Sequence, residues 1–203
     1  IYNGVFLPTE NSSENFFPIK KTHKFNCAII AVFYDKDIKG FQFLLPAIKN
    51  LIDLNIDICL HICGGGTYLE LYKTVAAELG ISSNCIFYGQ LEKNSIYSII
   101  SQMDFIVSAS LFESAGVSVE ESMILGKPLV ITRSGGASSL VTEKTAIVVD
   151  TKSVSALVQG ITQMILHLEN FDSVEIKKYA LENFGMEHVM QKYMDLYESF
   201  LIR

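Results

Sequence analysis

Charged side chains are scarce in this chain of 203 residues, which also has few cysteines and no long apolar run. Charged residues make up 19% of the sequence and hydrophobic residues 49%, a balance that excludes a disordered or linker-type protein. No apolar run approaches the roughly 20 residues that span a bilayer, since the longest, residues 27–34, has the length of a buried strand. The sequence therefore predicts a folded domain and not an integral membrane protein.

The chain also lacks the excess of basic residues that a nucleic-acid-binding surface requires. Its formal net charge is -6, so we expect no nucleic-acid partner, and any phosphate must be bound at one local site. The cysteines are Cys27, Cys59, Cys63 and Cys85. They lie within or beside apolar stretches, without the spacing of a disulfide scaffold, which favours a reducing, cytoplasmic location. The opening residues from Ile1 show no secretion signal and indicate a chain cut from a longer protein.

From residue 25 onward, short apolar runs alternate with stretches of helical periodicity. The apolar runs predict strands over residues 27–34, 56–62, 85–88, 104–108, 129–132 and 145–149. The periodic stretches predict helices over residues 41–52, 68–79, 94–103, 117–125, 136–141, 153–168, 173–183 and 187–202. Near-continuous apolar strands separated by helices indicate a doubly wound α/β fold, in which helices cover both faces of a parallel sheet. Residues 1–24 are rich in turn formers and are predicted to be a linker.

Glycine-bearing turns follow the predicted strands, and ligands of such sheets bind at the carboxyl edge where these turns lie. The turns are Lys39-Gly40, Gly64-Gly65-Gly66, Gly89, Ser114-Ala115-Gly116 and Ser134-Gly135-Gly136. The triple glycine most resembles a dinucleotide fingerprint, but Leu69 replaces its third glycine and no acidic residue stands near Asn84 to bind a ribose hydroxyl. An NAD site is therefore not expected, and a tight turn explains the triple glycine.

The segment from Glu113 to Glu121 joins a strand end, a turn of small residues and a helix start that carries two acidic groups. The backbone N–H groups of Ala115, Gly116 and Val117 would be unpaired at a helix N-terminus, where a diphosphate is stabilised. Glu113 can reach beyond the phosphates on one side and Glu121 on the other, so each carboxylate can bind one sugar. Taken alone, the spacing favours a simpler interpretation, in which the adjacent acidic pair forms a solvated helix face.

The order of these turns and of the acidic segment resembles one family, the retaining group 1 (family 4) glycosyltransferases of the GT-B fold. The resemblance covers almost the whole chain and is to the C-terminal, Rossmann-like, nucleotide-sugar-binding half of these enzymes. The matching pieces are residues 1–5, Lys39-Gly40, Gly64-Gly65-Gly66, Phe87-Tyr88-Gly89, Glu113 with Glu121, Gly126-Lys127-Pro128 and Gly135-Gly136. The resemblance implies a nucleotide-sugar-binding domain over residues 25–185 and a last helix, residues 186–203, that crosses back to an N-terminal acceptor domain.

The resemblance also implies a role for each candidate site residue. Lys39 would neutralise the donor diphosphate and Glu113 would bind hydroxyls of the transferred sugar, which makes these two the catalytic residues. Glu121 would hold the ribose. The other donor-binding groups would be the amides of Ala115, Gly116 and Val117 at the distal phosphate and backbone groups near Gln90 and Leu91 at the base. Family members attack the sugar from the same face with help from the leaving phosphate, and we expect no metal or other cofactor.

Three positions depart from the family pattern. Tyr34 stands where the family usually has an arginine, so the second diphosphate cation is missing unless Lys36 replaces it. Ser139 stands where an acidic residue usually follows the paired glycines, and Ala115 occupies a position that is often aromatic. The resemblance predicts a retaining hexosyltransferase that acts on a glycan or lipid-linked acceptor. Because of these departures, a noncatalytic module that binds a nucleotide sugar or a partner stays open as the alternative. The two glutamates disfavour a sugar-nucleotide epimerase.

The resemblance further implies a place in bacterial surface polysaccharide synthesis, such as that of capsule or lipopolysaccharide. The enzyme would be cytoplasmic and would associate peripherally with the inner face of the membrane through its N-terminal domain. We expect this chain alone to bind donor but to transfer no sugar. The apolar positions of the last helix, Met190, Tyr193, Leu196 and Phe200, are then predicted to be partly exposed.

A metal site is the main alternative elsewhere in the sequence. Cys59, His61 and Cys63 alternate along one predicted strand and so share a face. A strand buried on both faces often contains cysteine, and no fourth ligand lies nearby in sequence, so we expect these side chains to pack in the core. The turn around Ser108 and Ser110 is not a nucleophile elbow, and hydrolase chemistry is not indicated.

Overall fold

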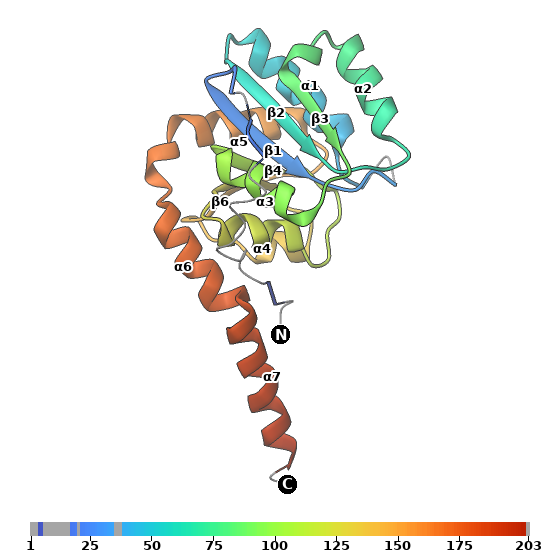
Figure 1. Cartoon of the computed structure of the whole chain (residues 1–203). Coiled ribbons are helices and arrows are strands. Elements are labelled where there is room, and N and C mark those ends of the chain that lie inside the picture. Colours follow the sequence, from blue (N-terminus) through green and yellow to red (C-terminus); the bar gives the residue numbers. More distant parts are fainter. Residues whose placement is uncertain (1–3, 6–16, 20, 35–37, 202–203) are drawn as a thin grey trace.

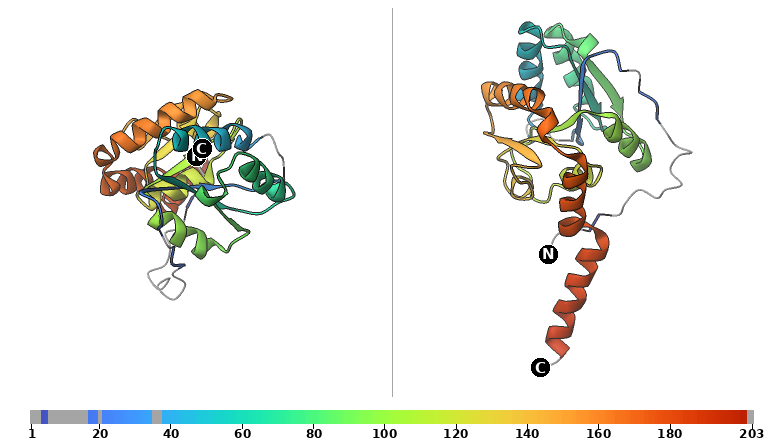
Figure 2. Two further views of the ribbon diagram at one scale, coloured as in Figure 1. Left: turned by 90° about the horizontal axis from the view of Figure 1, so that it is seen from above. Right: turned by 90° about the vertical axis from the view of Figure 1, so that its left-hand side faces the viewer.

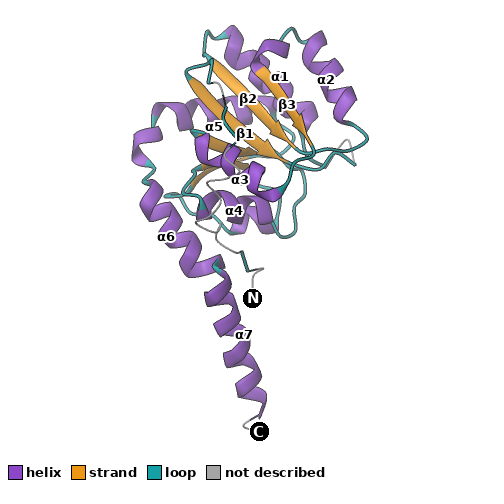
Figure 3. Cartoon of the chain, in the orientation of Figure 1, coloured by secondary structure: helices purple, strands orange, loops and turns teal. Residues whose placement is uncertain are grey.

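A computed structural model describes the chain except for residues 1–3, 6–16, 20, 35–37 and 202–203. In the described part, six parallel strands form one sheet with helices on both faces (Figures 1 and 3). The strands are β1 Phe25–Ile30, β2 Ile58–Cys63, β3 Cys85–Gly89, β4 Phe105–Ser108, β5 Leu129–Thr132 and β6 Ala146–Val149. Their order is β3-β2-β1-β4-β5-β6. The first three strands are thus added toward one edge of the sheet, and after β3 the chain returns to place β4 on the other side of β1, with β5 and β6 beyond it. This confirms the doubly wound α/β prediction and places the switch point between β1 and β4.

The helices divide the core into two layers, one on each face of the sheet. The helices are α1 Phe41–Asp53, α2 Leu69–Glu78, α3 Lys93–Gln102, α4 Val117–Ile124, α5 Val154–Leu166, α6 Ser173–Phe184 and α7 Met186–Leu201. Side chains of α1, α2 and α5 pack on one face together with Cys27 and Ile29 of β1. Side chains of α3, α4 and α6 pack on the other face with Ala28. The alternation of buried side chains along β1 is what a parallel strand covered on both faces requires.

The prediction of a strand over residues 27–34 was wrong at its end, because β1 stops at Ile30. Beyond that point the backbone follows the loop after β2: Ala31 N–H donates to Cys63 O and Phe33 N–H donates to Gly65 O. Since β4 ends at Ser108, no strand of the described part of the chain covers the other side of this extension. The apolar run continues past the sheet because its alternate side chains face a cavity that is described below.

The helix predicted over residues 136–141 was also wrong in length, because only a short 3-10 turn, Gly136–Ser139, forms there. A Cβ on Gly136 would lie 1.9 Å from the backbone oxygen of Ser114. The chain is thus pressed against the neighbouring loop at the start of the turn, and the buried side chain of Leu140 follows it directly. Two further 3-10 turns in the described part of the chain are Ser82–Asn84 and Leu168–Asn170. The second begins at Leu168, because α5 stops at Leu166, two residues before the end of the predicted helix.

Much of the segment predicted as a linker, residues 1–24, lies outside the described residues, as does Lys36. The parts that are described contact the domain. Val5 is buried and pairs with Gly185 at the end of α6, and Phe17 N–H donates to the Ser98 hydroxyl of α3. The domain boundaries therefore stay a prediction.

Helix α7 extends away from the sheet and its covering helices, as Figure 1 and the right-hand view of Figure 2 show. Its apolar positions Met190, Tyr193, Leu196 and Phe200 are between 42% and 64% exposed, which confirms the prediction made for them. Met194 and Tyr197 on the same helix are exposed as well. Within the described residues, no helix combines the length and the apolar character needed to cross a bilayer.

Candidate functional site

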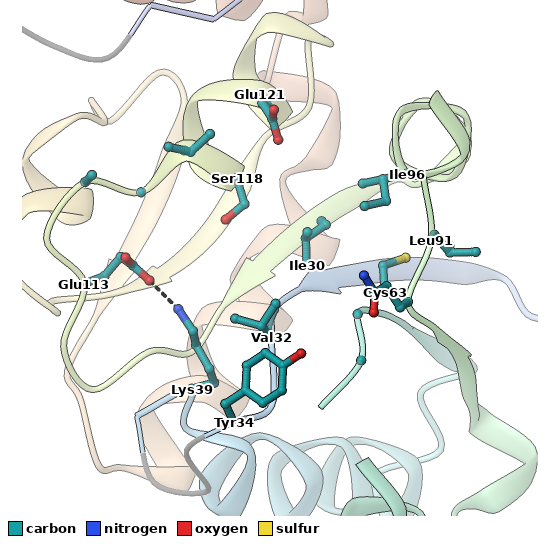
Figure 4. A pocket seen from close by; sticks show the side chains of 17 residues that line it. Ile30, Val32, Tyr34, Lys39, Cys63, Leu91, Ile96, Glu113, Ser118 and Glu121 are labelled. Carbon is teal, nitrogen blue, oxygen red and sulfur yellow. Dashed lines mark hydrogen bonds and ion pairs between the residues drawn. The ribbon is translucent and has the colours of Figure 1, made fainter. Parts of the chain in front are cut away.

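A cavity of about 550 Å³ opens at the carboxyl edge of the sheet, beside the switch point between β1 and β4. The structure brings all the predicted site residues together around it: Lys39, Gln90, Leu91, Glu113, Ala115, Gly116, Val117 and Glu121. Figure 4 shows Glu113, Ser118 and Glu121 on one wall, Cys63, Leu91 and Ile96 on the other, and Ile30, Val32 and Tyr34 between them. What these residues bind stays a prediction.

Lys39 is placed by the close packing of the turn between β1 and α1. Gly40 caps α1 in the left-handed region at φ 69°, and a Cβ there would lie 1.9 Å from the backbone oxygen of Ala109. Leu111 N–H also donates to Ile38 O over 2.7 Å, which ties this turn to the loop after β4. The result is an ion pair between Lys39 Nζ and Glu113 Oε2 at 2.7 Å, in which both side chains are about one-fifth exposed.

The loop that carries Glu113 is held in turn by the loop after β5. Glu113 N–H donates to Ser134 O, and Ala137 N–H donates back to Glu113 O. Glu113 and Gly135 form an isolated parallel bridge. The backbone of Glu113 is therefore fixed by two strand ends, and its side chain presents a carboxylate to the cavity.

The N-terminus of α4 points backbone donors at the same cavity. Gly116 caps the helix at φ 70°, and no side chain caps it. No acceptor in the described part of the chain takes the N–H groups of Ala115, Gly116 or Val117. Unpaired donors and the positive end of the helix dipole together favour an anion here.

Glu121 lies one turn further along α4 and is largely enclosed, with its side chain 11% exposed. Its Oε1 accepts a hydrogen bond from the Tyr97 hydroxyl at 2.9 Å and lies 3.0 Å from Lys93 Nζ. The neighbouring Glu120 is 1% exposed. The simpler interpretation of this acidic pair as a solvated helix face was therefore wrong, because α4 buries both side chains against the domain.

The triple glycine forms a tight turn, as the sequence predicted, and also lines the cavity through Gly64 and Gly65. Gly64 has φ 139°, and a Cβ there would lie 1.7 Å from the backbone oxygen of Ala31. Its N–H donates to Gly89 O, which brings Gln90 and Leu91 to the cavity. The turn thus sets the spacing between the ends of β1, β2 and β3.

Ser118, Val32, Tyr34 and Ile96 line the cavity but were not predicted as site residues. Ser118 follows Val117 in the first turn of α4, and its hydroxyl points into the cavity (Figure 4). Its place in the first turn of the predicted anion-binding helix could have identified Ser118 as a candidate site residue. Val32 and Tyr34 continue the period-two pattern of β1 and are 57% and 69% exposed. Their exposure shows that they form part of a cavity wall, and the hydropathy of the sequence alone could not predict this exposure.

The structure gives His61 core partners in place of metal ligands. The Tyr88 hydroxyl lies 2.8 Å from Nδ1, and Asn26 Oδ1 lies 3.2 Å from Nε2. Asn26 Nδ2 donates to His23 O, so its Oδ1 is the atom that faces the ring and can only accept. Nε2 therefore carries a proton, and in the neutral ring the Tyr88 hydroxyl donates to Nδ1. Among the described residues, no cluster of three His, Cys, Asp or Glu side chains could hold a metal ion.

Two buried groups away from the cavity walls have strongly shifted pKa values. Burial, with smaller effects from Lys21 and His23, lowers the pKa of His61 from 6.5 to about 4. Burial, with a smaller effect from the Glu121 charge, raises the pKa of Glu120 from 4.5 to about 7. Glu120 Oε2 has no hydrogen-bond partner among the described residues, which fits a carboxyl group that is partly protonated at neutral pH.

These two shifts predict opposite pH dependences of stability. Between about pH 4 and 6.5 the unfolded chain protonates His61 more readily than the folded chain, so this residue stabilises the fold as pH rises. Between about pH 4.5 and 7 the folded chain keeps the Glu120 proton more readily, so that residue destabilises the fold as pH rises. Relative to the unmodified chain, His61→Gln should lose stability with rising pH and Glu120→Gln should gain it, each by up to about 1.4 kcal/mol per pH unit. Urea unfolding at several pH values across this range measures both slopes, and pH-independent differences would contradict the assignment.

Comparison with known proteins identifies the family. Residues 12–180 match the family model described as glycosyl transferases group 1. The chain belongs to this family. Among curated proteins, it is 28% identical to the uncharacterized glycosyltransferase YqgM of Bacillus subtilis over 79% of this chain and 45% of that protein. It is also 28% identical to a GDP-mannose-dependent alpha-(1-6)-phosphatidylinositol monomannoside mannosyltransferase of Mycolicibacterium smegmatis, over 71% of this chain and 41% of that protein.

Solved structures of other proteins share the fold. Anabaena Alr3699/HepE in complex with UDP has a TM-score of 0.80 at 18% identity, covering 98% of this chain and 57% of that one. The lipopolysaccharide outer core galactosyltransferase WaaB has a TM-score of 0.80 at 17% identity, covering 98% of this chain and 54% of that one. The chain thus spans about half the length of the proteins that it matches.

Proposed function

We propose that the cavity binds a nucleoside diphosphate sugar and that the chain is the donor-binding half of a retaining hexosyltransferase. The observation that carries this proposal is the meeting, around one cavity, of Lys39, the free amides at the start of α4 and the carboxylates of Glu113 and Glu121. A cation and unpaired N–H donors suit a diphosphate, and the two carboxylates suit the hydroxyl groups of the sugars on either side of it. The volume of about 550 Å³ lies within the usual range for a small-molecule site.

The chemistry of transfer follows from where charge develops. The bond between the anomeric carbon and the phosphate oxygen breaks while an acceptor oxygen attacks the same face of the sugar. The acceptor proton passes to the leaving phosphate. Lys39 and the amides of Ala115, Gly116 and Val117 stabilise the negative charge that grows on that phosphate, and Glu113 orients the sugar through its hydroxyls. No step requires a metal ion, and we expect none.

The identity of donor and acceptor is proposed by class. Similar proteins are named as GDP-mannose-dependent enzymes or were solved with UDP, so a uridine or guanosine diphosphate sugar is the proposed donor. A lipopolysaccharide galactosyltransferase and a Klebsiella pneumoniae protein encoded in a cps region are among the similar proteins, which supports a glycan or lipid-linked acceptor in surface polysaccharide synthesis. The proposed location is the cytoplasm, with peripheral association at the membrane.

Acceptor binding is proposed to lie in a further domain of a longer protein, because this chain spans only about half of its relatives. The isolated chain should then bind donor and transfer no sugar. A full-length parent that moves sugar only when both halves are present would support this division. Transfer by the 203-residue chain alone would contradict it.

A noncatalytic nucleotide-sugar-binding module is the second candidate, and Tyr34 is the observation that favours it. Lys39 is the only cation among the described residues that line the cavity. Tyr34 lines the cavity at the position where the family usually has an arginine, and it supplies no positive charge there. A full-length parent that binds a nucleotide sugar but neither hydrolyses it nor transfers it would favour this candidate.

A thermal-shift panel with UDP, GDP, ADP and their common sugar conjugates tests the proposed function. A ligand at about 100 times its dissociation constant adds roughly 2.7 kcal/mol, which should raise the Tm by about 5–10 °C. Glu121→Ala should remove most of this shift. Glu70→Ala, which alters an exposed carboxylate on α2, is the matched control and should keep it. No shift with any nucleotide would contradict donor binding by this chain.

A further inference from the structure

Two side chains of α3 converge on one oxygen of Glu121. The Tyr97 hydroxyl donates to Oε1 over 2.9 Å, and Lys93 Nζ lies 3.0 Å from the same atom. Lys93 Nζ also lies 5.3 Å from the centre of the Tyr97 ring, so the lysine contacts both of the other side chains. Neither Tyr97 nor Lys93 lines the cavity, whereas Glu121 does.

We propose that Tyr97 and Lys93 are positioning residues that hold the Glu121 carboxylate in the orientation that binds the two ribose hydroxyls of the nucleotide. This inference rests on the proposed function, because it assigns Glu121 to the ribose of a nucleoside diphosphate.

The arrangement leaves one oxygen of Glu121 for a ligand. Each carboxylate oxygen can accept about two hydrogen bonds, and Oε1 already faces two donors. Oε2 is then the atom available to the cavity, and no donor within the described residues takes it. A diol that meets a preset carboxylate binds without the loss of side-chain freedom that a mobile glutamate would suffer.

Burial and charge support the same assignment. Tyr97 is 7% exposed and belongs to the core on the α3 and α4 face of the sheet, so its hydroxyl has a fixed position. Lys93 places a positive charge 3.0 Å from Glu121 Oε1, although its 59% exposure lets solvent screen that charge. The hydroxyl of Tyr97 should therefore contribute more to the orientation of Glu121 than Lys93 does.

The test compares the affinity for UDP and GDP with the affinity for their 2′,3′-dideoxy analogues, measured by calorimetric titration. The dissociation constant of the dideoxy analogue divided by that of the nucleotide reports the contribution of the ribose hydroxyls alone. Tyr97→Phe keeps the ring in the core and removes the hydroxyl, and it should lower this ratio by about 3- to 10-fold. Its affinity for the dideoxy analogues should stay unchanged. Lys93→Gln should lower the ratio less, and Lys93→Arg should restore it.

Two matched variants control for general effects. Tyr179→Phe, on α6, removes another tyrosine hydroxyl, which donates to Leu140 O over 3.0 Å. Lys73→Gln removes another exposed lysine that pairs with a glutamate. Both should leave the ratio unchanged. An unchanged ratio in Tyr97→Phe, or equal losses for the ribose and dideoxy ligands, would overturn the positioning role. Failure of the unmodified chain to bind UDP or GDP would instead contradict the proposed function.

Discussion

Gly40→Ala should destabilise the fold by about 2–5 kcal/mol, a larger loss than the same change at most other glycines. Two effects add at this position. The residue adopts φ 69°, which costs a side chain about 1–2 kcal/mol, and its new Cβ would lie 1.9 Å from the backbone oxygen of Ala109. Relief of such a contact requires the turn before α1 to move away from the loop after β4, at a further cost of about 1–3 kcal/mol. Urea unfolding measures the loss.

Gly80→Ala separates these two effects. Gly80 has φ 71°, nearly the same as Gly40, but nothing lies within 4 Å of the position of its Cβ. This control should lose only about 1–2 kcal/mol, the cost of the backbone conformation. Equal losses in the two variants would show that close approach to Ala109 does not hold the turn in place.

Lys39→Ala should weaken the binding of UDP or GDP by about 10- to 100-fold. The lysine supplies the cation of the cavity wall, and its removal also leaves the Glu113 carboxylate unpaired beside the diphosphate. The affinity for the corresponding nucleoside, which has no phosphate, should change little. Titration of both ligands, with the weaker nucleoside followed by NMR, gives the dissociation constants of the variant relative to those of the unmodified chain.

The double variant Lys39→Ala/Glu113→Ala tests how much of this loss comes from the unpaired carboxylate. It should bind UDP more tightly than Lys39→Ala does, because it no longer places a negative charge near the phosphates. Lys73→Ala, which alters an exposed pair on α2, should bind as the unmodified chain does. Equal weakening of nucleotide and nucleoside by Lys39→Ala would argue that this lysine does not contact the phosphates.

The sequence was sufficient to predict features that depend only on residue type or on the shared carboxyl edge of the parallel strands. Strand β5, Leu129–Thr132, was predicted to the residue, because Pro128 opens it and all its side chains are buried. Lys39, the triple glycine and the Glu113 segment meet at one cavity because the carboxyl ends of parallel strands share an edge.

Features that depend on which surfaces meet could not be read from the pattern. The approach of Lys39 to Glu113 depends on how closely the β1–α1 turn packs against the loop after β4. Tyr97 and Lys93 lie on a helix with no motif, and only the packing of α3 beside α4 brings them to Glu121. Only the simpler interpretation assigned Glu120 a position, and it placed the residue in solvent, because a charge pair in a sequence does not reveal which neighbours will cover it.

Helix α7 also contains reporters of its own environment. Met190 and Met194 expose 58% and 53% of their surface, whereas Met103, Met123 and Met164 are at most 2% exposed. A dilute peroxide should therefore convert the two α7 thioethers to sulfoxides well before the three core methionines react. Mass spectrometry of the oxidised peptides would then report, without any label, whether another surface covers this helix in a longer protein.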